Sequence, residues 1–171
     1  MKLAFLMNPL ESVKAYKDTS YFLMLAAHER NHKVFYFNQN MMKVANGVVH
    51  STIQRVAVHA SVEQPFTVLE TFDAELSGLD AIVVRTDPPV DRSYFYATLL
   101  LDMIGGRTVV VNRPSGIRNW NEKLAALCYP DITPATLVTR SGEDILKFSE
   151  QRGRLTLKPV DGHGGLSLIH I

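Results

Sequence analysis

The sequence is poor in cysteine and has no excess of charge of either sign. Its 171 residues include one cysteine, Cys128, so no internal disulfide framework is possible and a reducing cytoplasm is the expected compartment. Eighteen basic residues stand against 17 acidic ones, and this balance argues against nucleic acid or an anionic membrane as a partner. We interpret Cys128 as a small buried residue and not as a catalytic thiol, because no histidine lies near it in sequence.

Long hydrophobic runs are absent as well. A membrane span needs about 20 apolar residues, and a signal peptide needs a sustained apolar core with a small-residue cleavage site. The opening MKLAFLMNPLES reaches Asn8 and Pro9 after a few apolar residues. We therefore expect a protein with no membrane association.

Common catalytic and zinc-binding patterns are also missing. No pair of histidines has metal-ligand spacing with a nearby cysteine or carboxylate, so we predict no zinc site. No Ser-His-Asp arrangement or nucleophile elbow can be found. Any chemistry has to come from other residues.

Strand and helix signals alternate at the start of the chain. Residues 2–7 and 33–37 (KVFYF) have the composition of buried strands. Between them, Asp18 or Thr19 can cap a helix that runs to about His32. This strand–helix–strand order is the building block of a parallel sheet, so we predict an α/β fold of the Rossmann-like type.

The middle of the chain continues that pattern after an insertion. Asn46-Gly47 favours a type I′ turn and predicts a β-hairpin over residues 41–58. Apolar runs at 81–84 and 108–111 predict two further core strands, with a helix over 93–104 between them.

A smaller unit is predicted after residue 120. Residues 112–117, with a proline and a glycine, should be a connector. Asn121 should cap a short helix, and Ser141 should cap a second one. Strands are expected at 136–138 and 155–158.

The loop from Lys158 to Gly165 (KPVDGHGG) is the strongest local signal for binding. Gly162, Gly164 and Gly165 allow backbone N–H groups to face an oxyanion, and Lys158 can add a positive charge. The lysine precedes the glycines, so this is not a Walker A loop. A plain surface turn explains the same residues.

Three further residues have two interpretations each. Lys123 is either a second cation for a nucleotide or a solvated helix residue paired with an acid. Arg85 and Asp87 follow a buried strand, where doubly wound sheets place their ligand crevice. They could equally form an exposed ion pair on a stiff turn.

Several motifs in order resemble the prokaryotic glutathione synthetases from residue 1 to about residue 165. The motifs are 8–12 (NPLES), 17–20 (KDTS), 85–89 (RTDPP), 111–114 (VNRP), 121–124 (NEKL), 133–140 (TPATLVTR) and 157–162 (LKPVDG). The resemblance implies a Rossmann-like pre-ATP-grasp domain over 1–120 with a β-hairpin insertion. The opening, incomplete part of an ATP-grasp domain would follow over 121–165.

The resemblance also implies an activity and its ligands. Such enzymes are cytoplasmic homotetramers that use ATP with Mg²⁺ or Mn²⁺ to ligate γ-glutamylcysteine to glycine. Lys123, Lys158, Gly162, Gly164 and Gly165 match the ATP-binding residues. Asn8, Ser12, Arg85 and Asp87 lie in loops expected to face the peptide substrate, although relatives usually carry aspartate where Asn8 stands.

The matched segment covers only the family's amino-terminal half. The adenine-binding hinge, the acidic metal ligands and the phosphate-binding arginine belong to the other half, so we expect this chain to be inactive, with no metal ligands of its own. A different ATP-grasp amino-acid ligase, such as a D-alanine–D-alanine ligase, and a non-enzymatic binding module are the alternatives.

The last six residues, 166–171 (LSLIHI), are expected not to be native. The codons CTG TCT CTT ATA CAC ATC encode them, and this sequence matches a transposase end used in preparing DNA sequencing libraries. A short genuine terminal strand is the alternative.

Overall fold

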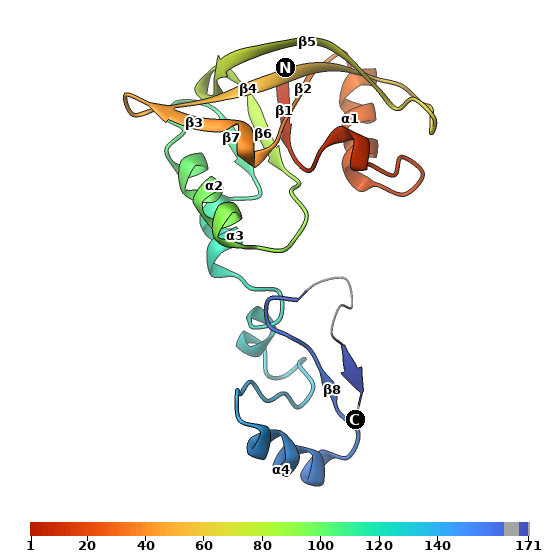
Figure 1. Ribbon diagram of the computed structural model, residues 1–171, viewed down its shortest axis with the longest axis vertical. Coiled ribbons are helices and arrows are strands. Elements are labelled where there is room, and N and C mark those ends of the chain that lie inside the picture. Colours follow the sequence, from red (N-terminus) through yellow and green to blue (C-terminus); the bar gives the residue numbers. More distant parts are fainter. Residues whose placement is uncertain (163–167, 171) are drawn as a thin grey trace. The chain divides into compact units, whose positions relative to one another are not determined.

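Two units make up the chain, residues 1–118 and residues 119–171. The computed structural model describes residues 1–162 and 168–170. A seven-stranded sheet lies in the first unit and a two-stranded sheet in the second (Figure 1).

Four parallel strands form the centre of the first unit. They are β1 (Lys2–Leu6), β2 (Lys33–Phe37), β6 (Ala81–Val84) and β7 (Val109–Val111), in the order β2-β1-β6-β7. Each pair of neighbours is parallel, with Leu3 opposite Val34 on one side and Ala81 on the other. The predicted Rossmann-like α/β fold is confirmed.

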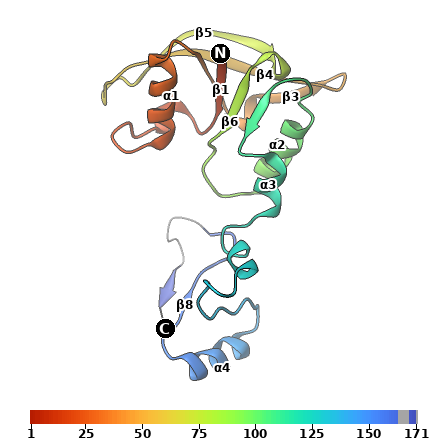
Figure 2. The ribbon, with the colours of Figure 1, turned by 180° about the vertical axis from the view of Figure 1, so that it is seen from behind.

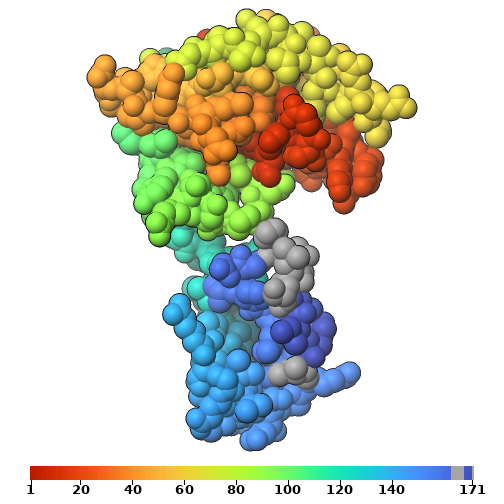
Figure 3. Space-filling model, viewed as in Figure 1, coloured from red at the N-terminus to blue at the C-terminus, as the bar shows by residue number. Residues whose placement is uncertain are grey.

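An antiparallel extension widens this sheet beyond β2. The hairpin of β3 (Met42–Ala45) and β4 (Val48–Val58) turns at Asn46 and Gly47, whose φ angles of 51° and 80° are the positive values that the sequence predicts. β4 pairs with β2 and also with β5 (Phe66–Glu75). In Figure 3 these strands, orange to yellow, form a continuous surface beside the red amino-terminal segment.

The strand β5 was not predicted. Its sequence, FTVLETFDAE, carries three acidic residues, and most of its positions are exposed. Hydrophobic periodicity therefore gives little signal, and the strand forms because β4 offers a long partner: its pairings run from His50–Glu75 to Val58–Phe66.

Helices cover both faces of the sheet (Figures 1 and 2). α1 (Thr19–Glu29) lies on one face, and α2 (Arg92–Asp102) with α3 (Pro114–Asn119) lies on the other. Asp18 caps α1 through the amides of Ser20 and Tyr21, as predicted, although the helix ends at Glu29 and not near His32. Asp91 caps α2.

Side chains of β1 alternate between two apolar clusters. Ala4 and Leu6 pack on the α2 face. Phe5 packs on the α1 face, as does Met7 directly after the strand. Burying one large apolar side chain contributes about 1.5–3 kcal/mol, so strands that are apolar on both faces need helices on both.

The helix α3 corrects the expectation of a connector over 112–117. Proline fits the first turn of a helix, where its missing N–H has no partner to lose, so Pro114 starts the helix instead of preventing it. Arg118 then ties α3 to α2 by donating to the carbonyl oxygen of Thr98 at 3.1 Å and by pairing with Asp102.

The second unit is small and open. It contains a 3₁₀ helix (Ala125–Cys128), α4 (Gly142–Arg152), β8 (Thr156–Leu157) and β9 (Ile169–His170). Ser141 caps α4 as predicted. Asn121 accepts from the amides of Lys123 and Leu124, but the short helix starts only at Ala125, with Leu124 as its N-cap, so the predicted helix cap at Asn121 is wrong. None of the described residues after 118 is buried, so Cys128 is exposed and not the buried residue that we expected.

Two strand predictions in this unit have different outcomes. The strand at 155–158 is present as β8, shortened to two residues. No strand forms at 136–138, since an extended segment needs a hydrogen-bonded neighbour and no described segment pairs with it. β8 instead pairs antiparallel with β9, within the segment 166–171. Such a short pairing could form whether or not residues 166–171 are native. Their non-native origin therefore stays a prediction.

Candidate functional site

A pocket of about 370 Å³ lies in the first unit, where two neighbouring parallel strands end. Leu6 of β1 pairs with Val84 of β6, so the loops after these strands leave the sheet at the same edge. Asn8 follows β1, and Arg85 and Asp87 follow β6. This edge is where open α/β sheets bind their ligands.

All four residues predicted to face a peptide substrate line this pocket. They are Asn8, Ser12, Arg85 and Asp87. The sequence reasoning did not assign binding roles to the other polar residues in the lining, Lys14, Lys17, Asp18, Thr19 and Ser20. Four of these five residues belong to the motif KDTS at 17–20, which is one of the motifs shared with the family. That motif could have indicated their place in the pocket.

Hydrogen bonds connect the two loops. The Asn8 side-chain oxygen accepts from the backbone N–H of Asp87 at 2.9 Å, and the Arg85 Nε donates to the Ser20 hydroxyl at 3.1 Å. Ser20, in the first turn of α1, is 4% exposed, so this hydrogen bond holds the Arg85 side chain at the buried start of the helix. The hydroxyl of Ser12 donates to the carbonyl of Pro9 at 2.6 Å and stabilises the turn after β1.

Arg85 and Asp87 do not form the ion pair that was the alternative interpretation. Among the described residues, no salt bridge joins the two. Both act on the buried Tyr94: burial raises the pKa of Tyr94 above its ordinary value of 10.0, Arg85 lowers it and Asp87 raises it. The guanidinium and the carboxylate therefore lie near one phenol without neutralising each other directly.

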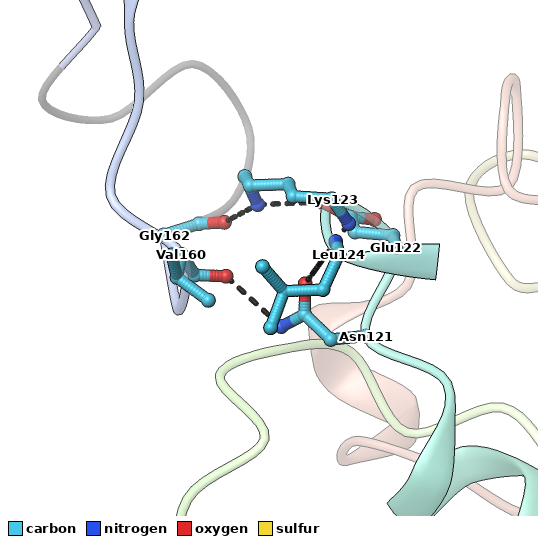
Figure 4. Close-up of polar contacts among 6 residues, drawn as sticks. All are labelled: Asn121, Glu122, Lys123, Leu124, Val160 and Gly162. Carbon is cyan, nitrogen blue, oxygen red and sulfur yellow. Dashed lines mark hydrogen bonds and ion pairs between the residues drawn. The ribbon is translucent and has the colours of Figure 1, made fainter. Parts of the chain in front are cut away.

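The residues predicted to bind ATP lie in the second unit, and two of them are in contact (Figure 4). The Lys123 ammonium donates to the carbonyl oxygen of Gly162 at 2.5 Å and to Glu122 Oε1 at 2.8 Å. Asn121 donates to the carbonyl oxygen of Val160 at 3.0 Å. The NEKL turn is thus tied to the loop that follows β8.

The other predicted ATP-binding residues are Lys158, Gly164 and Gly165. Lys158 is exposed, directly after β8. Gly164 and Gly165 lie outside the described residues. The Lys123 side chain is 23% exposed and is paired with an acid, as its alternative interpretation held, yet it also reaches the glycine loop.

Residues 1–162 and 168–170 contain no group of three or more His, Cys, Asp or Glu side chains that could hold a metal ion. Within the same residues, no helix has the length and apolarity that crossing a membrane requires.

Comparison with known proteins gives two family matches. The N-terminal domain of prokaryotic glutathione synthetase matches residues 1–118, and the ATP-grasp domain of prokaryotic glutathione synthetase matches residues 122–171. Both units of the chain therefore match successive domains of one family.

Curated relatives with the name glutathione synthetase agree with these matches. The one from Vibrio cholerae is 37% identical over 172 residues, which cover 100% of this chain and 54% of the relative. The one from Gloeobacter violaceus is 40% identical over 171 residues, which cover 96% of this chain and 53% of the relative. The chain spans about half the length of the curated relatives it matches.

Proposed function

This chain belongs to the prokaryotic glutathione synthetase family, and on that premise we propose that it forms the amino-terminal half of an ATP-dependent ligase that joins γ-glutamylcysteine to glycine. The cysteinyl carboxylate would take the γ-phosphoryl group of ATP. The glycine amine would then displace phosphate and form the amide bond. The catalysis of such transfers rests on positioning and on neutralising negative charge.

The contact between Lys123 and Gly162 is the observation that carries the nucleotide part of this proposal. Two segments that the sequence singles out independently, NEKL and the glycine loop, meet at this contact. An ammonium has three N–H donors, and Gly162 and Glu122 take two of them. The third has no partner within the described residues, and it would bind a phosphate oxygen together with the backbone amides of the loop.

The remaining predicted residues would bind the phosphates and the peptide substrate. Lys158 would place a second positive charge at the phosphates, together with Gly162, Gly164 and Gly165. A bound Mg²⁺ or Mn²⁺ would neutralise phosphate charge, and its ligands would come from outside the described residues. Asn8, Ser12, Arg85 and Asp87 would bind γ-glutamylcysteine. By the same resemblance, the full-length protein would be a cytoplasmic homotetramer.

A fused enzyme tests the proposed reaction. Residues 1–165 are joined to the carboxyl-terminal half of the Vibrio cholerae relative, and ADP release is measured with each substrate omitted in turn. We expect ADP formation that requires both γ-glutamylcysteine and glycine. Turnover with D-alanine in their place would instead support the alternative ligase, and a folded fusion with no turnover would contradict the proposal.

A further inference from the structure

The helix α2 is apolar on the side that points away from the sheet (Figures 1 and 2). Its sheet side consists of four buried residues, Tyr94, Ala97, Thr98 and Leu101. Its other side carries four large apolar residues that are between 39% and 55% exposed, Phe95, Tyr96, Leu99 and the C-cap Met103. With about 3.6 residues per turn, these two sets are centred on opposite sides of the helix axis. We call the exposed set the α2 stripe.

The α2 stripe is continuous along the helix. Phe95, Leu99 and Met103 follow one another at intervals of four residues, so they lie on successive turns of one side. The rings of Phe95 and Tyr96 are in edge-to-face contact, with their centroids 6.0 Å apart. A surface helix usually turns polar residues outward, and single exposed apolar residues are common. A run of aromatic residues, leucine and methionine over three turns is instead typical of a protein–protein interface.

The two ends of the stripe carry opposite charges. Arg92 stands in the first turn of α2 and Asp102 in the last. A cation at the amino end of a helix and an anion at its carboxyl end are both disfavoured by the helix dipole. Arg92 has no ion-pair partner among the described residues, whereas Asp102 pairs with Arg118. A second helix that runs antiparallel to α2 would bring its negative carboxyl end to Arg92.

We propose that the α2 stripe is a contact between two copies of this chain, packed antiparallel about a two-fold axis. Such a contact requires a patch that complements itself, and an apolar stripe with opposite charges at its ends does so. Arg92 of each copy then lies beside Asp102 of the other and extends the pair of Asp102 with Arg118. A net charge of +1 opposes self-association little. The contact uses residues of the first unit alone and is independent of the proposed reaction.

The expected dimer is weak. A stable interface buries about 800 Å² on each partner, and a single stripe on a helix of this length offers less. We therefore expect the 171-residue chain to dimerise with a Kd on the order of 10 μM. Sedimentation equilibrium over a range of protein concentrations on both sides of this value measures the Kd directly.

Two substitutions test the stripe. Leu99→Lys places a charge in the middle of the apolar contact and should raise the Kd at least about tenfold. Its matched control is Leu146→Lys on α4, where Leu146 is 64% exposed. Arg92→Glu brings an anion to the partner's carboxyl end and should raise the Kd at least about threefold. Its control is Arg154→Glu, at an exposed arginine of the second unit. Melting curves check that each variant is folded.

Disulfide trapping tests the antiparallel direction. With Cys128 replaced by serine, one chain carries Arg92→Cys and another carries Met103→Cys. Antiparallel packing brings these two positions together in a mixed dimer. The two copies of position 103 then lie about 15 Å apart, because the helix rises about 1.5 Å per residue, and a disulfide needs Cα atoms within about 7 Å. We expect a disulfide-linked dimer from the mixture and none from the Met103→Cys chain alone.

Several results would overturn this contact. They are a chain that stays monomeric at all concentrations, equal Kd values for Leu99→Lys and Leu146→Lys, and a disulfide that forms faster from Met103→Cys alone than from the mixture. In the fused enzyme, Leu99→Lys should weaken subunit association. A lower melting temperature with unchanged association would show that the carboxyl-terminal half covers the stripe, and would refute the contact between copies. Turnover of the fused enzyme decides the proposed reaction and not this contact.

Discussion

The Lys123 ammonium lies 2.5 Å from the carbonyl oxygen of Gly162, although 39 residues separate the two in sequence. Asn121 makes a parallel contact to Val160 at 3.0 Å. Together these contacts place the start of the predicted phosphate loop against the NEKL turn within the second unit. The contact with Gly162 therefore holds the Lys123 charge beside the loop that is predicted to bind the phosphates of ATP.

Removing the Lys123 charge should weaken ATP binding in the fused enzyme. We expect Lys123→Gln to raise the KM for ATP by about tenfold or more and to leave the KM for glycine nearly unchanged, because one charge-assisted contact to phosphate is lost. Lys147→Gln is the matched control, since Lys147 is exposed and pairs with Glu143 on the same helix. An ATP KM equal to that of the control would assign Lys123 a structural role only.

Lys158 should behave differently from Lys123 because it is exposed before ATP binds. Lys158→Ala in the fused enzyme should raise the KM for ATP and lower kcat, while thermal stability without ATP stays the same. Steady-state kinetics and a melting curve measure the two effects. If the ATP kinetics are unchanged, Lys158 is an ordinary surface residue with no role in ATP binding.

The 171-residue chain alone should have no ligase activity. By the family resemblance, the acidic metal ligands belong to the carboxyl-terminal half, and without them the charge on the transferred phosphoryl group would not be neutralised. Phosphate release is measured with ATP, γ-glutamylcysteine and glycine present together. Release by pure chain that depends on all three would show the expectation to be wrong.

The second unit should be cut by protease before the first. None of its described residues is buried, and apolar side chains such as Ile132 and Leu146 are 84% and 64% exposed. Segments with few buried contacts open easily. Limited trypsin digestion should first cleave after Arg140, Arg152 or Arg154. Early cleavage within residues 1–118 is the contrary result.

The first unit should lose stability in alkaline solution. Burial raises the pKa of Tyr36 and of Tyr94 above their ordinary value of 10.0, so the fold favours the neutral phenols. This contribution is fully present below pH 10 and is lost as the pH rises through the raised pKa values. Urea unfolding of the variant Tyr36→Phe, Tyr94→Phe should show a smaller loss between about pH 9 and 11 than the unchanged chain. Replacing the exposed Tyr129 by Phe is the control, and an identical loss in all three proteins would refute the explanation.

Local signals in the sequence were enough for the alternating core and its caps. Buried strands, the Asp18 cap and the positive φ angles at Asn46 and Gly47 depend on neighbouring residues, and all of them were predictable. The buried face of α1 was less clear. Tyr21, Met24 and Ala27 are buried positions of α1, whereas the equally apolar Phe22 is 50% exposed. A helix that is apolar on most sides does not specify which side packs.

What the sequence determined by itself is the order of elements and the residue types in each loop. What only the tertiary structure decided is which loops meet. β5 forms because β4 offers a partner, and the pocket forms because parallel pairing of β1 with β6 brings Asn8 beside Asp87, 79 residues away. Contacts at such separations depend on chain topology, and no local pattern encodes them. The same holds for the second unit, where folding of the chain brings Lys123 into contact with Gly162, 39 residues away.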